Sequence, residues 1–120
     1  MKLCDFYLGN KLIAKKVKYC DTFKLKLVGL MFVRLPGSGA YLPGVKDIHM
    51  NFVRFNLRIV WLDKNLKVLD STIAKTWRLY YGPTEATNVL ELPVDNKRKI
   101  QNGDKLRIKI YESSKRKNRR

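Results

Sequence analysis

The 120-residue sequence has few of the residues on which most recognised catalytic and metal sites depend. His49 is its one histidine, which excludes the usual multi-histidine metal sites. Cys4 and Cys20 have neither the CxxC spacing of a zinc or redox site nor the density of a secreted disulfide scaffold, so we interpret them as reduced thiols packed as small hydrophobic residues. No apolar run approaches the roughly 18 residues that cross a bilayer. Asp5 interrupts the start of the chain where a signal peptide would be apolar. We therefore expect a cytoplasmic protein with no membrane partner.

Acidic residues are scarce as well, since 10 Asp and Glu stand against 26 Lys and Arg and give a formal net charge of +16. An excess of this size attracts polyanions. The last eight residues, SSKRKNRR, include five basic and no apolar residues. We expect residues 113–120 to be a disordered basic tail that follows a single β-rich domain over residues 1–112. The expected partner of the tail is nucleic acid or another polyanion, and the alternative is a tail that only keeps the protein soluble. Its candidate contacts are Lys115, Arg116, Lys117, Arg119 and Arg120.

The rest of the chain has mostly the pattern of β-strands, and its 45% hydrophobic residues are enough for a core. Two pairs of apolar segments are separated by the turn signals Gly9-Asn10 and Lys64-Asn65, so each pair is predicted to form a hairpin. Segment 3–8 is expected to pair with segment 11–19, and segment 57–63 with segment 66–74. The other extended segments are 48–55, 88–93, 105–111 and a short piece at 40–42 inside an irregular loop.

One short helix is predicted between the first hairpin and the irregular loop. Asp21 or Thr22 can cap a helix that begins at Phe23 and ends near Gly29. The long helices that parallel crossovers require are missing. About six short strands with one helix therefore predict a mainly antiparallel β-sandwich or a partly open barrel.

Several short motifs follow one another in an order similar to that of a known family. They are Gly29-Leu30-Met31-Phe32, Ile48-His49-Met50, Ile59-Val60-Trp61-Leu62-Asp63, Trp77, Val89-Leu90-Glu91-Leu92 and Gly103-Asp104. Together they resemble the DUF192 or UPF0127 family of uncharacterised small proteins, from Lys11 to about Ile108. The resemblance implies a compact, mainly β, jelly-roll-like fold, and it supplies no established activity or cofactor. The chain departs from the family pattern at Val33, where an Arg is usual, and at Arg58, where an Asp is usual.

The resembling motifs include the residues that would bind a ligand. Gly29 is either the stop of the helix or a ligand contact, and His49 is either a structural histidine or a ligand contact. Glu91 lies between Leu90 and Leu92, so its side chain is expected to point away from their face, to solvent or into a polar cleft. The candidate ligand-binding residues are Gly29, Met31, His49, Met50, Trp77 and Glu91.

The acidic residues of these motifs are Asp63, Glu91 and Asp104, and no local spacing among them supports a pair of carboxyl groups for general acid–base chemistry. We therefore assign no catalytic residue, no cofactor and no metal site, and leave open whether the protein is an enzyme. Asp104 is expected to shape the turn before the last strand by accepting hydrogen bonds from backbone amides.

Two segments mix aromatic and basic residues as single-stranded nucleic-acid sites do. In AKTWRLYYG, stacking on bases is the role considered for Trp77, Tyr80 and Tyr81, and phosphate binding for Lys75 and Arg78. NFVRFNLR offers a similar mixture in Phe52, Arg54, Phe55 and Arg58. The alternative is that the aromatic side chains belong to the core.

Two classes of function follow. The first is a non-catalytic module that binds a small ligand or a partner protein, with the basic tail as an accessory site for polyanions. The alternative is a nucleic-acid-associated protein in which basic and aromatic residues bind the partner. An unrecognised enzyme is the third.

Overall fold

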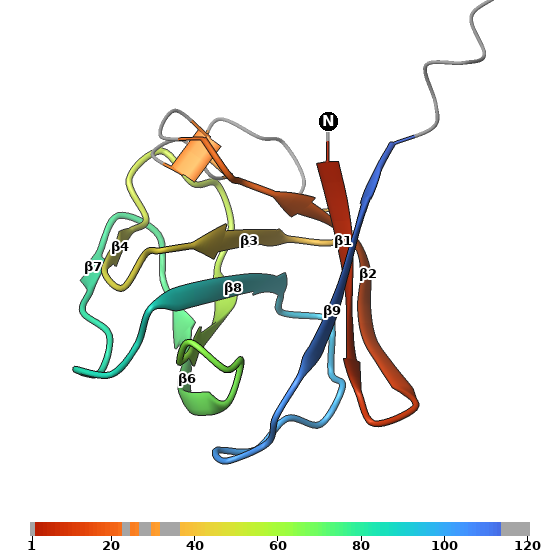
Figure 1. Ribbon diagram of the computed structural model, residues 1–120. Helices are drawn as coiled ribbons and strands as arrows, with labels where there is room; N and C mark the ends of the chain where they lie inside the picture. The colour runs from red at the N-terminus through yellow and green to blue at the C-terminus, as the bar shows by residue number, and fades with distance from the viewer. Residues whose placement is uncertain (1, 23–24, 27–29, 32–36, 114–120) are drawn as a thin grey trace, which may run out of the picture.

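The computed structural model describes residues 2–22, 25–26, 30–31 and 37–113. Nine β-strands lie within these residues (Figure 1). They are β1 (Lys2–Leu8), β2 (Lys11–Tyr19), β3 (Ala40–Pro43), β4 (Ile48–His49), β5 (Leu57–Leu62), β6 (Val68–Ala74), β7 (Leu79–Tyr80), β8 (Asn88–Pro93) and β9 (Arg107–Glu112).

Seven of the strands form one sheet in the order β6-β5-β8-β3-β2-β1-β9, and β4 pairs with β7 in a small second sheet. Neighbouring strands are antiparallel except for β2 and β3, which are parallel. The predicted mainly β fold is therefore confirmed, with one parallel pair in an otherwise antiparallel arrangement.

The two edges of the large sheet meet at one end. Lys67 forms a bridge with Lys105, just before β6 and β9 begin. The amide of Leu106 donates to the carbonyl oxygen of Leu66 at 2.9 Å, and the amide of Val68 donates to that of Asp104 at 2.8 Å. Within the described residues, the strands β6 and β9 do not pair beyond this point. The sheet thus curls into a partly open barrel.

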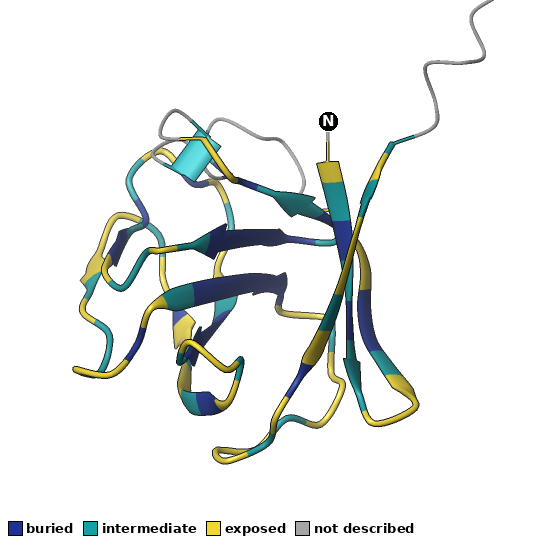
Figure 2. Ribbon diagram, in the orientation of Figure 1, coloured by how far each residue is buried: buried dark blue, intermediate teal, exposed yellow. Residues whose placement is uncertain are grey.

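Both faces of the sheet are buried at its central strands, where alternate residues enter two separate cores. On β5, Ile59 and Trp61 belong to the first core, whereas Val60 and Leu62 belong to the second. Figure 2 shows the same burial along β3 and β8, which lie beside each other in the sheet. The first core extends under the small sheet through Met50, which is fully buried.

The turn chemistry read from the sequence explains the local connections. Gly9 has φ +63° in the turn between β1 and β2. In the turn between β5 and β6, the Oδ1 atom of Asp63 accepts hydrogen bonds from the amides of Asn65 and Lys67 at 2.8 and 2.9 Å. Both predicted hairpins are confirmed.

The predicted cap of the helix is confirmed at Thr22, whereas the predicted first residue of the helix, Phe23, lies outside the described residues. The hydroxyl oxygen of Thr22 accepts a hydrogen bond from the amide of Leu25 at 3.1 Å, as an N-cap does, and Leu25 and Lys26 are helical. The predicted end of the helix near Gly29 lies outside the described residues.

Two segments differ from the prediction because distant parts of the chain determine them. The short piece at β3 is a central strand between β2 and β8. Its approach to β8 requires Gly39, which has φ +101° and where a Cβ atom would overlap the carbonyl oxygen of Glu91. The predicted extended segment 48–55 keeps only Ile48–His49 as a strand, and Phe52 has φ +63° in the turn that follows.

Candidate functional site

The structure does not gather the predicted ligand-binding residues around one hollow. Met50 is fully buried, Met31 and His49 are half-buried, and Trp77 is exposed over 61% of its surface. Gly29 lies outside the described residues. Two hollows can be delineated within the described part of the chain, and other residues line them.

Glu91 lies at the centre of β8, where its register partners are Ala40 on β3 and Ile59 on β5. Its side chain faces away from Leu90 and Leu92, as expected from strand alternation. The expectation that it meets solvent or a polar cleft is wrong, because only 5% of the residue is exposed. Burial raises the pKa of Glu91 to about 7, and the Lys18 ammonium lowers it in part. This carboxyl group therefore changes protonation near neutral pH.

The two cysteines are free and buried, which confirms that they pack as small hydrophobic residues. The Sγ atom of Cys4 donates to the carbonyl oxygen of Val17 at 3.6 Å. Burial raises the pKa of Cys4 to about 12 and that of Cys20 to about 11. Both side chains remain thiols at neutral pH and are poor nucleophiles.

An exposed pair of aromatic rings stands beside the small sheet. The ring centroids of Phe52 and Trp77 are 5.0 Å apart, and the rings meet edge to face at 64°. Phe52 is 48% and Trp77 61% exposed, and both residues have positive φ. The structure thus joins the two mixed aromatic and basic segments that the sequence shows separately.

The pair is held in place by the backbone of Met50. The carbonyl oxygen of Met50 accepts a hydrogen bond from the amide of Trp77 at 2.9 Å and one from the amide of Val53 at 3.3 Å. The amide of Met50 donates to the carbonyl oxygen of Arg78 at 2.8 Å. Because the Met50 side chain is buried in the first core, these bonds tie the backbone of Trp77 and that of Val53, the residue after Phe52, to the body of the protein.

Two more exposed side chains, Leu79 at 59% and Tyr81 at 70%, follow Trp77 along the chain. We call Phe52, Trp77, Leu79 and Tyr81 the exposed aromatic surface. The idea that Trp77 belongs to the core is wrong. Tyr80, the second aromatic residue of the segment AKTWRLYYG, is partly buried against the first core, and its hydroxyl oxygen accepts a hydrogen bond from the Lys75 amide at 2.7 Å. Phe55 packs against the same core.

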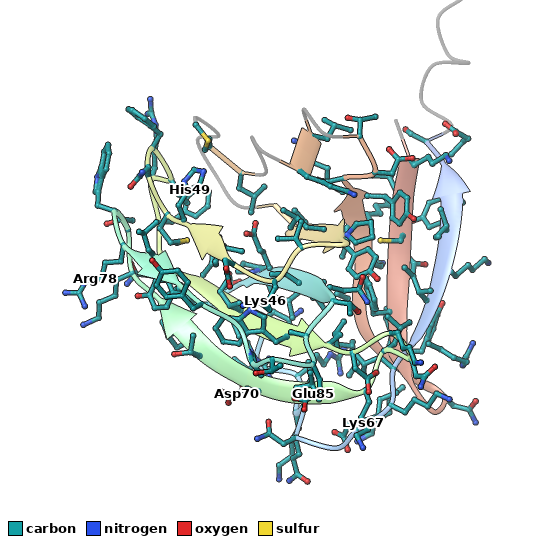
Figure 3. All side chains as sticks on the ribbon, turned by 60° about the vertical axis from the view of Figure 1, so that its left-hand side comes forward. Lys46, His49, Lys67, Asp70, Arg78 and Glu85 are labelled. Atoms are coloured by element: carbon teal, nitrogen blue, oxygen red, sulfur yellow. The ribbon has the colours of Figure 1, made fainter. Side chains whose placement is uncertain are left out.

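Basic side chains accompany this surface. Arg54, Lys75 and Arg78 are exposed, and Figure 3 shows Arg78 at the same end of the molecule as His49. Arg58 has a different task, because its Nη1 atom donates to the carbonyl oxygens of Asn96 at 3.0 Å and Arg98 at 2.8 Å. Burial lowers the pKa of this guanidinium. The predicted contacts of the basic tail, Lys115, Arg116, Lys117, Arg119 and Arg120, lie outside the described residues.

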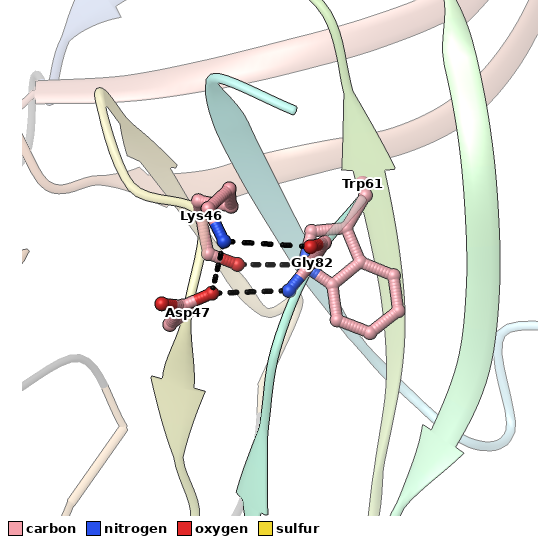
Figure 4. Close-up of polar contacts among 4 residues, drawn as sticks. All are labelled: Lys46, Asp47, Trp61 and Gly82. Carbon is pink, nitrogen blue, oxygen red and sulfur yellow. Dashed lines mark hydrogen bonds and ion pairs between the residues drawn. The ribbon is translucent and has the colours of Figure 1, made fainter. Parts of the chain in front are cut away.

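A group of four residues joins the small sheet to β5 (Figure 4). The indole Nε1 atom of Trp61 donates to the carbonyl oxygen of Lys46 at 2.8 Å. The Asp47 carboxylate accepts the amide of Gly82 at 3.1 Å and contacts the Lys46 ammonium at 2.8 Å, and this ammonium holds the pKa of Asp47 below its usual value. Gly82 is required here because a Cβ atom would come within 2.6 Å of the Trp61 ring. These contacts hold the small sheet, beside which the exposed aromatic surface lies, against β5.

The remaining polar predictions concern turns and metals. The Asp104 carboxylate accepts a hydrogen bond from the amide of Gln101 at 2.8 Å, which confirms its expected role in the turn. Among the described residues, no group of three His, Cys, Asp or Glu side chains could hold a metal ion. The same residues include no helix that is both long and apolar enough to span a membrane.

These features define a small, mainly β protein whose curled seven-stranded sheet carries a two-stranded sheet at one end. The fold is similar to that in the crystal structure of a protein of unknown function from Novosphingobium aromaticivorans DSM 12444. The TM-score is 0.71, the match covers 87% of this chain and 82% of that one, and 17% of the residues are identical. Because the identity is low, this similarity shows the fold alone.

Residues 8–108 match the family DUF192, described as "Uncharacterized ACR, COG1430", and the chain belongs to this family. The resemblance seen in the sequence is confirmed. The chain is 36% identical over 85 residues to the UPF0127 protein TK1120 of Thermococcus kodakarensis, a match that covers 66% of this chain and 54% of that protein. It is 28% identical over 99 residues to the UPF0127 protein PH1112 of Pyrococcus horikoshii, covering 77% and 86%. The chain therefore spans about half the length of TK1120.

Proposed function

We propose that this chain is a non-catalytic binding module for single-stranded nucleic acid, which binds at the exposed aromatic surface and at the basic side chains beside it. The observation that carries the proposal is the contact between Phe52 and Trp77, two large exposed rings on backbone segments that are hydrogen-bonded to Met50. Exposed aromatic rings of this kind accept stacked bases, and each stacked base contributes roughly 1–3 kcal/mol to binding.

The charge near the surface favours a polyanion over a protein partner. The segments 48–62 and 71–84 include the basic residues Arg54, Arg58, Lys75 and Arg78 and no acidic residue. Arg58 is bound to loop carbonyls, which leaves Arg54, Lys75 and Arg78 as the exposed cations within two residues of Phe52 or Trp77 in the sequence. Cations next to stacking rings can contact the phosphates that connect the bases. The basic tail is proposed as an accessory site that adds further phosphate contacts.

A small ligand in an enclosed pocket has less support from the described residues. Met50 and Glu91 are buried, and Trp77 is exposed, so these candidates do not share a hollow.

The sequence alone identifies Trp77, Lys75 and Arg78 as candidate binding residues, but it does not show the contact between Phe52 and Trp77. The signal that could have found it is the presence of two similar mixtures of aromatic and basic residues in one chain.

A binding titration tests the proposal. A fluorescently labelled oligodeoxythymidine of about 15 nucleotides is titrated with the full chain, and anisotropy reports binding. Trp77→Ala and Phe52→Ala are each expected to weaken binding by about 5- to 100-fold, because each removes one stacking ring. The matched control is Ile110→Ala, which removes an exposed apolar side chain from β9.

Thermal unfolding of each variant shows whether it is folded. If Trp77→Ala binds the oligonucleotide as tightly as Ile110→Ala does, the exposed aromatic surface is not the site. If wild type binds a duplex of the same length as tightly as it binds the oligodeoxythymidine, charge alone accounts for the affinity, and this result would also contradict the proposal.

A further inference from the structure

A second region of positive charge lies in the loop between β8 and β9, away from the exposed aromatic surface in the sequence. Lys97, Arg98 and Lys99 follow one another there. Together with Arg58 they surround a hollow of about 440 Å³. Its apolar residues are Ile73, Val94 and Ile100. We call this site the basic hollow.

The loop that forms the basic hollow is fixed by hydrogen bonds to two strands. The Nδ2 atom of Asn96 donates to the carbonyl oxygen of Ile13 on β2 at 3.0 Å, and its Oδ1 atom accepts the amide of Arg98 at 3.0 Å. Arg58 on β5 donates to the carbonyl oxygens of Asn96 and Arg98. The backbone that carries the three consecutive basic side chains is therefore positioned before any ligand arrives, which lowers the entropy lost on binding.

The lining of the basic hollow has both apolar and positively charged residues. Ile73 is 51% and Val94 43% exposed, so apolar surface faces the solvent there. The charged lining residues are Arg58, Lys97, Arg98 and Lys99, and no acidic side chain lines the hollow. Asp95 belongs to the same loop but is not among the lining residues. A ligand that complements this surface has an anionic end and an apolar or aromatic body.

A second hollow of about 250 Å³ lies against the first, because Asn96 and Arg98 line both. Lys15 and Ser38 contribute further polar groups on that side. Arg98 thus borders both hollows. Arginine suits phosphate because its planar group of donors matches two phosphate oxygens at once.

We propose that the basic hollow binds a small organic phosphate of about the size of a mononucleotide. The phosphate contacts Arg98 and the neighbouring lysines, and the apolar body lies on Ile73 and Val94. Arg58 acts as a positioning residue, since its guanidinium holds the loop. The basic hollow is open to solvent, so the bound phosphate remains partly exposed. This site goes beyond the proposed nucleic-acid surface and uses none of its four residues.

Adenosine monophosphate is the probe for this site, with adenosine and inorganic phosphate as separate comparisons. Isothermal titration calorimetry at low salt, using the full chain, measures all three. The monophosphate is expected to bind more tightly than either comparison. Arg98→Gln is expected to weaken its binding by at least about tenfold, because it removes a charged donor that hydrogen-bonds the phosphate.

The matched control is Lys64→Gln, which removes one positive charge from the exposed turn between β5 and β6. Arg98→Gln keeps the backbone groups that fix the loop, so thermal unfolding is expected to be unchanged. The proposal is overturned if the monophosphate does not bind, if Arg98→Gln behaves like Lys64→Gln, or if adenosine or inorganic phosphate binds as tightly as the monophosphate. Loss of monophosphate binding in Trp77→Ala would place the site at the exposed aromatic surface and would also overturn it.

Discussion

Glu91 keeps its carboxyl group inside the protein, with a pKa of about 7 in place of the ordinary value of 4.5. In the unfolded chain the group loses its proton near the ordinary value, whereas in the folded protein it keeps the proton until about pH 7. Between these values the folded state binds more protons than the unfolded state. The free energy of unfolding therefore falls as pH rises through this window and levels off above it. A shift of this size corresponds to roughly 3 kcal/mol.

We predict that Glu91→Gln is more stable than wild type at about pH 8, by up to roughly 3 kcal/mol, because the variant has no buried charge to form. At about pH 4 the two proteins should have nearly the same stability, since Glu91 is then protonated in both states. Urea denaturation at several pH values measures the difference. A difference that does not change with pH would show that burial of the Glu91 charge is not its cause.

At the scale of the elements, Asp5 joins three neighbouring strands. Its Oδ1 atom accepts a hydrogen bond from the hydroxyl group of Tyr111 on β9 at 2.8 Å and one from the amide of Lys16 on β2 at 2.9 Å. Burial and the Asp5 carboxylate raise the pKa of Tyr111 to about 12, so the hydroxyl keeps its proton at neutral pH. This contact anchors β9, which is an edge strand of the large sheet.

We predict that Tyr111→Phe lowers the free energy of unfolding by about 1 kcal/mol, because it removes one hydrogen bond to the Asp5 carboxylate. The same substitution in an Asp5→Ala background is the control. Chemical denaturation of the four proteins gives the coupling between the two side chains. If Tyr111→Phe has the same effect in both backgrounds, the hydrogen bond does not stabilise β9.

The elements that could be predicted from the sequence are those with local causes. The turn signals Gly9-Asn10 and Lys64-Asn65 each lie between two segments that pair with each other, so both hairpins follow from neighbouring residues. The place of β3 could not be predicted, because its partners β2 and β8 are distant and because Gly39 allows β8 to approach.

The same distinction applies to the candidate site. The aromatic and basic residues near Trp77 are visible in the sequence, but its contact with Phe52 accompanies a hydrogen bond from the Trp77 amide to the carbonyl oxygen of Met50, which is distant from Trp77 in the sequence. Strand alternation predicts the face on which Glu91 lies. Alternation does not predict that Glu91 is buried, because this depends on the residues of the first core, which come from distant parts of the chain.

Across the whole molecule, positive charge occurs in separate regions. One accompanies the exposed aromatic surface near β7, another surrounds the basic hollow, and a third is the predicted tail over residues 113–120. These regions should affect binding differently. Stacking depends little on salt, whereas phosphate contacts release counterions and make affinity fall as salt rises.

We predict that replacing Lys115, Arg116, Lys117, Arg119 and Arg120 by Gln weakens binding to single-stranded nucleic acid and flattens the slope of log affinity against log salt. The slope should fall by up to about 0.7 for each single-strand phosphate contact that is lost. Thermal stability should be nearly unchanged, since residues 113–120 include no apolar residue to bury. Titrations at several salt concentrations measure both quantities. An unchanged affinity and slope would mean that the tail does not bind the polyanion.

Binding at the exposed aromatic surface can be observed directly through the two tryptophans of the chain. In a two-dimensional NMR spectrum each indole N–H gives its own signal. Trp61 serves as an internal control, because its Nε1 atom already donates to the carbonyl oxygen of Lys46, whereas Trp77 is exposed over 61% of its surface. Titration with oligodeoxythymidine is predicted to shift or broaden the Trp77 indole signal and to leave that of Trp61 in place. An unchanged Trp77 signal at an oligonucleotide concentration that saturates the protein would contradict the central claim that this surface binds nucleic acid.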